Sequence, residues 1–376
     1  MLLDNIKKGF FISASVYVSD AHGGVQRCTR EYLAAIKAAG WNLEILPYSI
    51  DRQWQTRLLR KLKPSSFYNR IPQSFISDLV NRVISENISW VFLNQVDSLP
   101  IVPHLKQAIP NVKIVLLSHG AQFVDEFLAA QSIDSLSIQA RSRLANTILD
   151  EMSLRQSLDH VFTLSEEETV FEQWLGAKSV SWLPRAVSPQ PLDWRPILGR
   201  VGFVGTLEHT PNYEGLVNVL NILQKRNDFD GCIRIVSSSE SLGNSLTKRF
   251  SFVEYLGRLS NEALHNEALT WCWFIHPLFC WSRGCSTKLA DALEWQIPVL
   301  TTEAGCRGYT WKDGNVVKVN TVKDFCSYLV NFNSIDKIED IRSNVILASS
   351  TSPSIDDVAD KINHALWNYI KNKADQ

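Results

Sequence analysis

Short apolar runs alternate along the chain with longer stretches in which apolar residues recur every three or four positions. Runs of this length are typical of buried strands, and the periodic stretches are typical of helices that bury one face. We predict strands at 9–18, 43–46, 90–93, 112–117, 161–164, 180–183, 201–204, 233–236, 253–256, 273–278 and 298–301. Strands that alternate with helices favour parallel sheets with helical crossovers, so the pattern predicts an α/β fold.

The predicted helices begin and end at residue types that suit helix termini. Val25, Tyr32 and Ile36 recur at helical spacing ahead of Gly40, and glycine is favoured just after a helix. Ser165 precedes three glutamates, which suit the positive end of a helix dipole. Further helical patterns lie at 137–158, from 213 onward, and at 288–293, 321–332 and 354–372.

A proline-rich stretch at 184–196 separates the two halves of this alternation. The chain has 376 residues, which is enough for two domains of ordinary size. We therefore predict one domain at 1–190, a second at 191–352 and a closing helical segment at 353–376.

The stretch from Trp271 to Tyr309 carries the strongest chemical signal. It reads as a strand, a loop with Ser282, Gly284 and Ser286, a helix, and a second strand. The first turn of such a helix has free N–H groups and the positive end of the dipole, which suit a diphosphate. Lys288 lies just inside this helix and Arg283 just before it. Asp291 follows one turn later, where a carboxylate suits sugar hydroxyls.

A plainer interpretation of this stretch is also open. Gly/Ser loops before helices are common, and Lys288 with Asp291 would then be an ordinary exposed ion pair.

Two features of the N-terminal half suggest a second ligand-binding edge. Gly23 and Gly24 follow the first predicted strand and would let the backbone approach a ligand, or would only make a tight turn. His119 follows the strand at 112–117, and ligands of open α/β sheets bind beyond the carboxyl ends of strands. We predict that His119 reaches the substrate, although a single histidine is often only structural.

A basic segment interrupts the alternation. Residues 52–70 contain six basic side chains and no acid, with Trp54, Leu58, Leu59 and Leu62 interleaved. This pattern is typical of an amphipathic helix on an anionic membrane, and equally of a surface helix that packs on its own domain. No run reaches the roughly 18 apolar residues that span a bilayer.

Composition narrows the class of protein. Hydrophobic residues make up 45% of the chain, charged residues 20%, and the formal net charge is −1. These values fit a folded protein and argue against a nucleic-acid binder, which would carry a strong basic excess. The seven cysteines form no metal-ligand pattern, so we expect free thiols in a cytoplasmic protein and no metal site.

The segment 276–308 resembles the donor-site segment of GT-B glycosyltransferases, especially the large retaining family 4. It shares Pro-Leu, a Gly/Ser turn, Lys-Leu-x-x-Ala, Pro-Val and a Gly-x-x-Gly turn. The resemblance implies two Rossmann-like domains facing a cleft, with Asp291 on the nucleotide ribose. Lys288 and the loop residues Gly284, Cys285, Ser286 and Thr287 would hold the diphosphate. Arg283 stands where the family has its first glutamate, so the usual carboxylate that contacts the sugar is missing.

Other elements also resemble the family. Gly23 and Gly24 match its N-terminal loop beside the donor phosphates. The letters "FVG" at 203–205 and "PN" at 211–212 match a strand of the family and the loop that follows it. The resemblance implies donor contacts for Gly23, Gly205, Thr206 and Asn212. It implies that His119 and Gly24 shape the reacting sugar, and that the final helix crosses back to the first domain.

This chain departs from the family after the strand at 201–204. Thr206, Glu208 and His209 lie where many members have an arginine and a lysine. The negative charge of the phosphates would then have to be compensated by Lys288, Arg283, Arg185 and the helix dipole.

The resemblance implies a glycosyltransferase that moves a sugar from a nucleotide-sugar to an acceptor hydroxyl, with retention and without an essential metal or other cofactor. Surface polysaccharide or glycan assembly is the expected setting, with a glycan acceptor carried on a lipid at the inner face of the plasma membrane. A nucleotide-sugar epimerase of the same fold and a non-catalytic binding partner remain as alternatives.

Overall fold

The computed structural model describes residues 7–19, 23–50, 71–131, 137–331 and 334–374. Contacts divide the chain into two compact units. The first comprises residues 1–184, 283–285 and 355–376, and the second comprises 185–282 and 286–354. The basic segment 52–70 lies outside the described residues.

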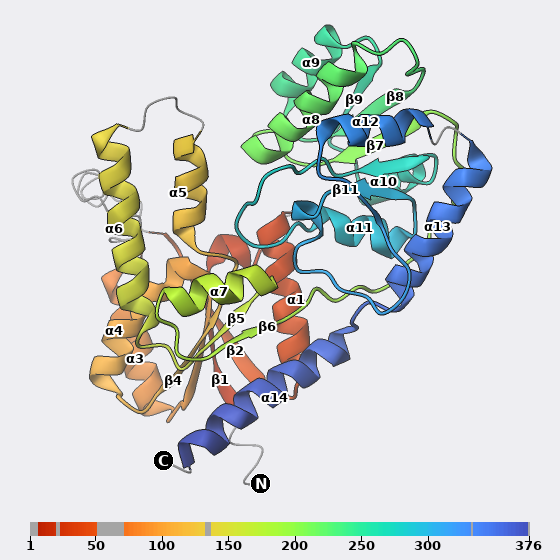
Figure 1. The fold of residues 1–376 in the computed structure, drawn as a ribbon. Helices are drawn as coiled ribbons and strands as arrows, with labels where there is room; N and C mark the ends of the chain where they lie inside the picture. Colours follow the sequence, from red (N-terminus) through yellow and green to blue (C-terminus); the bar gives the residue numbers. More distant parts are fainter. Residues whose placement is uncertain (1–6, 20–22, 51–70, 132–136, 332–333, 375–376) are drawn as a thin grey trace. The chain divides into compact units, whose positions relative to one another are not determined.

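The first unit is built on a parallel sheet of six strands in the order β2-β1-β3-β4-β5-β6 (Figure 1). The strands are β1 (Lys8–Ala14), β2 (Asn42–Tyr48), β3 (Trp90–Asn94), β4 (Lys113–Leu117), β5 (His160–Thr163) and β6 (Val180–Trp182). All five residues of β3 are buried, as expected for a strand covered on both faces. Such strands are continuous apolar runs, which explains why the pattern of the sequence reveals them.

Helices connect these strands and cover the sheet. They are α1 (Gly24–Ala38), α3 (Gln73–Ser85), α4 (Val102–Ala108), α5 (Gln122–Gln131), α6 (Ile138–Arg155) and α7 (Glu166–Trp174), with short 3₁₀ turns at Ser15–Tyr17 and Val96–Ile101. Helix α14 (Ile355–Ala374) returns from the far end of the sequence and packs against α1 (Figure 1). The Lys7 ammonium donates to the side-chain oxygen of Asn363 (2.9 Å), which also ties the start of β1 to α14.

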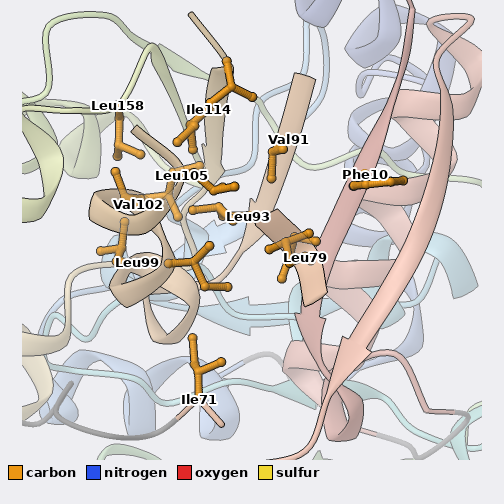
Figure 2. Close-up of a cluster of buried hydrophobic side chains, with 14 of the residues drawn as sticks. Phe10, Ile71, Leu79, Val91, Leu93, Leu99, Val102, Leu105, Ile114 and Leu158 are labelled. Atoms are coloured by element: carbon orange, nitrogen blue, oxygen red, sulfur yellow. The ribbon is translucent and has the colours of Figure 1, made fainter. Parts of the chain in front are cut away.

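The core of the first unit lies between the sheet and these helices. Figure 2 shows its centre, where side chains of β1, β3, β4, α3 and α4 meet. Phe10, Val91, Leu93, Leu105 and Ile114 are fully buried there. Burying one such side chain contributes about 1.5–3 kcal/mol, so this cluster is a main source of the unit's stability.

The second unit repeats the architecture with the strand order β12-β11-β10-β7-β8-β9. Its strands are β7 (Arg200–Val204), β8 (Cys232–Val236), β9 (Val253–Gly257), β10 (Trp273–Ile275), β11 (Val299–Thr301) and β12 (Val317–Lys318). Its helices are α8 (Thr210–Leu223), α9 (Glu240–Arg249), α10 (Asn261–Ala268), α11 (Lys288–Trp295), α12 (Val322–Asn331) and α13 (Ile335–Ser350), with a 3₁₀ turn at Ala304–Cys306. Every pairing in both sheets is parallel, which confirms the predicted α/β class.

Some element boundaries differ from the prediction. The first strand ends at Ala14 and not at residue 18, because its last pairing partner in β2 is Tyr48 and the chain then turns into a 3₁₀ helix. Helix α8 begins at Thr210, three residues before the predicted start, because proline is well tolerated in the first turn of a helix. The run at 273–278 forms a strand only as far as Ile275.

The proline-rich stretch after β6 lies along the second unit. Several of its backbone N–H groups donate to carbonyl groups of that unit: Val187 to Pro353, Gln190 to Glu294, Leu192 to Trp295, Arg195 to Leu269 and Ile197 to Thr270. The stretch is therefore attached to the second unit from Arg185 onward.

In the described part of the chain, no helix is both long and apolar enough to cross a membrane.

Candidate functional site

Two loops of the second unit follow neighbouring strands. β10 pairs directly with β7, and the strand order reverses direction at this pair. In open α/β sheets, ligands bind beyond the carboxyl ends of the strands at such a switch point. The loop after β7 contains Gly205 and Thr206, and the loop after β10 leads into α11. Both carry residues that the sequence predicts to bind the donor.

Lys288, the first residue of α11, is the centre of this site. Its ammonium donates to the side-chain oxygen of Asn212 at 3.2 Å, and the Asn212 amide donates in turn to the carbonyl of Thr206 at 3.0 Å. A Cβ atom at Gly205 would lie only 2.5 Å from Cε of Lys288, so the lysine stem passes over a position that has no side chain. The structure thus brings Lys288 together with Gly205, Thr206 and Asn212, although Lys288 and Asn212 are 76 residues apart in the sequence.

Burial changes the acidity of this lysine. The side chain is half-buried, and loss of hydration lowers the pKa of Lys288 to about 8, while the negative charge of Asp291 acts to raise it. Lys288 with Asp291 is therefore not an exposed surface pair. The ammonium remains largely charged at neutral pH but lies close to its titration range.

The loop before α11 is held by buried groups. The Ser286 hydroxyl is hydrogen-bonded to Nε2 of His276 (3.0 Å), and Nδ1 of that ring is 3.2 Å from the Thr301 hydroxyl. The phenol of Tyr309 donates to the Ser286 carbonyl at 2.5 Å and accepts from the backbone N–H of Ala290 at 3.1 Å. Burial, with the nearby charges of Lys288 and Arg307, keeps the pKa of His276 well below its usual range. His276 is therefore uncharged, and it holds the loop through the hydrogen bond of its ring to Ser286.

Arg307 also fixes this loop. It is 4% exposed and donates to the carbonyls of Ala304 (2.7 Å) and Ser282 (2.6 Å), and its guanidinium lies 5.1 Å from the ring centre of Trp281. The predicted phosphate contact Arg185 is buried as well, and its backbone N–H donates to the carbonyl of Gly308 at 2.8 Å.

The sequence missed His276, Arg307 and Tyr309 as parts of the site. Only the position of the arginine inside the Gly-x-x-Gly turn could have indicated it, because the contacts of all three join segments 10 to 25 residues apart.

The remaining predicted donor residues lie in different surroundings. Arg283, Gly284 and Cys285 belong to the first unit, where the Arg283 guanidinium donates to the side-chain oxygen of Gln122 at 2.7 Å and the Gly284 N–H donates to Glu168. Cys285 is half-buried and forms no disulfide. Thr287 precedes α11 without a side-chain cap, and Asp291 lies half-buried in the first turns of the helix.

The first unit places its predicted site residues at the carboxyl ends of its strands. Gly23 and Gly24 are exposed at the start of α1, and the backbone of Gly23 is extended, so glycine is not required there by conformation. His119 follows β4 and is 5% exposed, with Nε2 2.9 Å from the side-chain oxygen of Asn94. Gly120 has a φ of +102°, and a Cβ there would lie 2.6 Å from the backbone nitrogen of Gly284, so only glycine fits.

A buried ionic cluster supports the backbone next to His119. Arg155 bonds to Glu172 at 2.8 Å and to Glu151 at 3.0 Å, and all three side chains are at most 1% exposed. Burial raises the pKa of the Glu151 carboxyl, and the two carboxylates raise the pKa of Arg155 against the opposing effect of burial. The Ser118 hydroxyl donates to Glu172 at 2.7 Å.

The same cluster fixes the start of α5. Backbone N–H groups of Gln122 and Phe123 donate to Glu151 at 2.9 and 3.0 Å. The cluster therefore positions residues on both sides of His119.

Within the described ranges, no three His, Cys, Asp or Glu side chains are grouped so that they could hold a metal ion.

No protein-family model matches the chain, and no curated protein sequence matches it. Solved structures match it in fold over nearly their whole length. Sucrose-phosphate synthase from Thermosynechococcus elongatus is 13% identical, with a TM-score of 0.67 over 97% of this chain and 100% of that one. HepE from Anabaena, solved in complex with UDP and glucose, is 11% identical, with a TM-score of 0.62 over 96% and 100%.

A glycosyltransferase from Rickettsia africae is 13% identical, with a TM-score of 0.62 over 97% of this chain and 99% of that one. At such identities the similarity shows the fold alone. The fold is that of the GT-B glycosyltransferases, as the sequence predicted.

Proposed function

We propose that the protein is a glycosyltransferase that moves a sugar from a nucleotide-sugar donor to an acceptor hydroxyl. The observation that carries the proposal is the ammonium of Lys288, which Asn212 holds at the start of α11 beside the ends of β7 and β10. A cation at the start of a helix, where the helix dipole is positive, suits a diphosphate.

The proposed chemistry is the transfer of a glycosyl group. The bond between the sugar's anomeric carbon and the diphosphate breaks, a bond from the acceptor oxygen to that carbon forms, and the proton of the acceptor hydroxyl passes to the departing diphosphate. Lys288 and the positive end of the α11 dipole would stabilise the charge of the leaving diphosphate, which is the main electrostatic task of such a site. Asp291 would bind the ribose, and His119 with Gly24 would shape the sugar. Retention and independence of metal rest on the resemblance of 276–308 to the retaining family.

A uridine nucleotide is the first donor to test, because HepE was solved with UDP and glucose. The protein is incubated with a panel of nucleotide sugars, and free nucleoside diphosphate is measured with and without glycan acceptors. Release of diphosphate supports a transferase. Interconversion of the nucleotide sugar would instead indicate an epimerase, and tight binding without turnover would indicate a binding partner.

We expect the Asp291→Asn variant to bind ribose nucleotides more weakly while its affinity for inorganic diphosphate stays nearly unchanged. The reason is that the carboxylate accepts hydrogen bonds from ribose hydroxyls, and a charged acceptor is stronger than an amide. Calorimetry with UDP and with diphosphate measures both affinities. Glu294→Gln is the control, and the assignment would be wrong by one helical turn if that variant gave this signature.

We expect the affinity for UDP to fall as the pH rises above about 8, because deprotonation of Lys288 removes the cation that meets the phosphates. The pKa is lowered, so the lysine is charged below this pH and neutral above it. Each further pH unit reduces affinity by up to about tenfold. Titrations between pH 7 and 9.5 avoid the phosphate's own ionisation near 6. An affinity that stays constant over this range would contradict the role of Lys288.

The acceptor is proposed to be a glycan on an anionic membrane surface at the cytoplasmic side, on the basis of the basic segment 52–70. Each Lys or Arg near such a surface contributes about 1 kcal/mol, and the attraction weakens with salt. We expect the protein to sediment with liposomes that contain anionic lipid, and a variant with Arg57, Arg60, Lys61 and Lys63 changed to Gln to remain in solution. Equal, salt-insensitive behaviour of the two proteins would exclude the membrane surface.

A further inference from the structure

Three strands of the first unit contribute to one group of buried polar side chains beside His119. Ser13 lies in β1 and Asn94 ends β3, while His119 follows β4. Thr29 of α1 completes the group. Ser13, Thr29 and Asn94 are fully buried, and His119 is 5% exposed. Buried polar groups of this kind need partners, so their hydrogen bonds determine how each one is oriented.

Asn94 is the link between these groups. Its amide nitrogen lies 3.0 Å from the Ser13 hydroxyl and 3.0 Å from the Thr29 hydroxyl. Its side-chain oxygen lies 2.9 Å from Nε2 of His119. The Ser13 hydroxyl also donates to the carbonyl of Ala14 at 3.2 Å.

These contacts fix the orientation of the Asn94 amide. A hydroxyl carries one hydrogen, and that of Ser13 is used on Ala14, so the Ser13 oxygen has to accept from Asn94. The NH₂ group of Asn94 therefore faces Ser13, and its carbonyl faces His119. Because a carbonyl only accepts, Nε2 of His119 has to carry the hydrogen. In the neutral ring, the lone pair is then on Nδ1.

The Nδ1 atom is available to a ligand. None of the described residues forms a hydrogen bond with this atom. A buried nitrogen without a hydrogen bond would be an unsatisfied buried atom, and Nδ1 of His119 is not one, so it keeps contact with solvent. Tyr32 packs against the ring with its centre 5.3 Å away and donates to the Ser118 carbonyl at 3.1 Å. The ring is thus held on two sides while one acceptor atom stays open.

We propose that Asn94 positions His119 as the Nε2–H tautomer, so that Nδ1 accepts a hydrogen bond from a hydroxyl group of the bound ligand. Asn94 acts through the histidine and is a positioning residue. In the neutral ring, a lone pair at Nδ1 accepts a hydrogen bond from a hydroxyl donor and repels an oxyanion. The identification of the ligand as a sugar rests on the proposed function, whereas the tautomer does not.

The tautomer is measured on the full chain without ligand. Long-range proton–nitrogen correlation spectra at alkaline pH distinguish a ring nitrogen that carries hydrogen from one that does not, and the spectrum of His119→Gln identifies the resonances of His119. We expect hydrogen on Nε2 in the wild type and in Asn94→Asp, whose carboxylate also only accepts. Asn94→Leu removes the acceptor, so this variant should show a mixture or hydrogen on Nδ1.

Hydrogen on Nδ1 in the wild type would overturn the proposal, and so would an unchanged tautomer in Asn94→Leu. If Asn94→Leu does not fold, the wild-type spectrum still tests the proposal, because hydrogen on Nδ1 would overturn it.

The ligand is probed with UDP-glucose and its deoxyfluoro analogues, since fluorine replaces a hydroxyl but does not donate. We expect one analogue to bind the wild type at least roughly fivefold more weakly than UDP-glucose, the usual value of one hydrogen bond. His119→Asn keeps a polar atom near the place of Nδ1 and should retain this discrimination. His119→Gln keeps one near Nε2 and should lose it.

Equal binding of all analogues to the wild type would overturn the hydroxyl contact. If UDP-glucose itself does not bind, the proposed donor fails, and the ring spectrum still decides the role of Asn94.

Discussion

Replacing Lys288 with alanine is expected to weaken the binding of UDP by at least about tenfold while the binding of uridine changes little. The ammonium would meet only the phosphates, and a charge-assisted hydrogen bond contributes about 1.5–3 kcal/mol. The geometry strengthens the expectation, because Asn212 holds the ammonium at 3.2 Å and Gly205 leaves room for its stem. Calorimetric titration with both ligands measures the difference.

The control for this experiment is Lys318→Ala, which removes an exposed lysine that pairs with Glu303 at 3.2 Å. This variant should bind UDP as the wild type does. An equal loss of affinity for UDP and uridine in Lys288→Ala would show that the lysine supports the fold of the loop and does not contact phosphate.

Replacing Arg155 with methionine is expected to lower the free energy of unfolding by about 3–5 kcal/mol, because Glu151 and Glu172 would remain buried without their cation. Chemical denaturation monitored by circular dichroism measures the change. The cluster also holds Ser118 and the start of α5, so loss of stability should be accompanied by loss of order around His119.

Two further variants test the cause of this destabilisation. Arg82→Met removes a more exposed arginine that pairs with Glu44 and Glu86 and should leave unfolding nearly unchanged. A triple variant with Arg155→Met, Glu151→Gln and Glu172→Gln removes the charges together and should recover much of the lost stability. Equal stability of Arg155→Met and Arg82→Met would contradict the role assigned to the cluster.

The sequence predicts the strands well, for a physical reason. Parallel strands that are covered on both faces are continuous apolar runs, and β3 and β4 begin and end within a residue of the predicted ranges. Ser165 likewise caps α7 as predicted, since its hydroxyl accepts from the backbone N–H of Glu168 at 3.3 Å. Local rules decide these features, so a local pattern reveals them.

Contacts between distant segments are what the sequence does not predict. Lys288 and Asn212 are both predicted donor residues, but their hydrogen bond joins positions 76 residues apart. Asn94 lies one residue beyond the predicted strand 90–93, and its contact with His119 depends on the neighbouring placement of β3 and β4. Arg155 and Glu151 look like an exposed pair one helical turn apart, and only the tertiary packing buries them.

The return of α14 to the first unit has a consequence for the order in which the protein is made. This helix buries Val358, Ala359, Ile362 and Leu366 in the first unit, whose other helices and strands all end by Trp182, long before α14 begins at Ile355. Domains generally fold as they leave the ribosome, starting from the N-terminus. In this chain, the face of α1 that α14 covers stays exposed to solvent until the second unit has been synthesised. The first unit is therefore complete only when α14 has been synthesised and covers this face of α1.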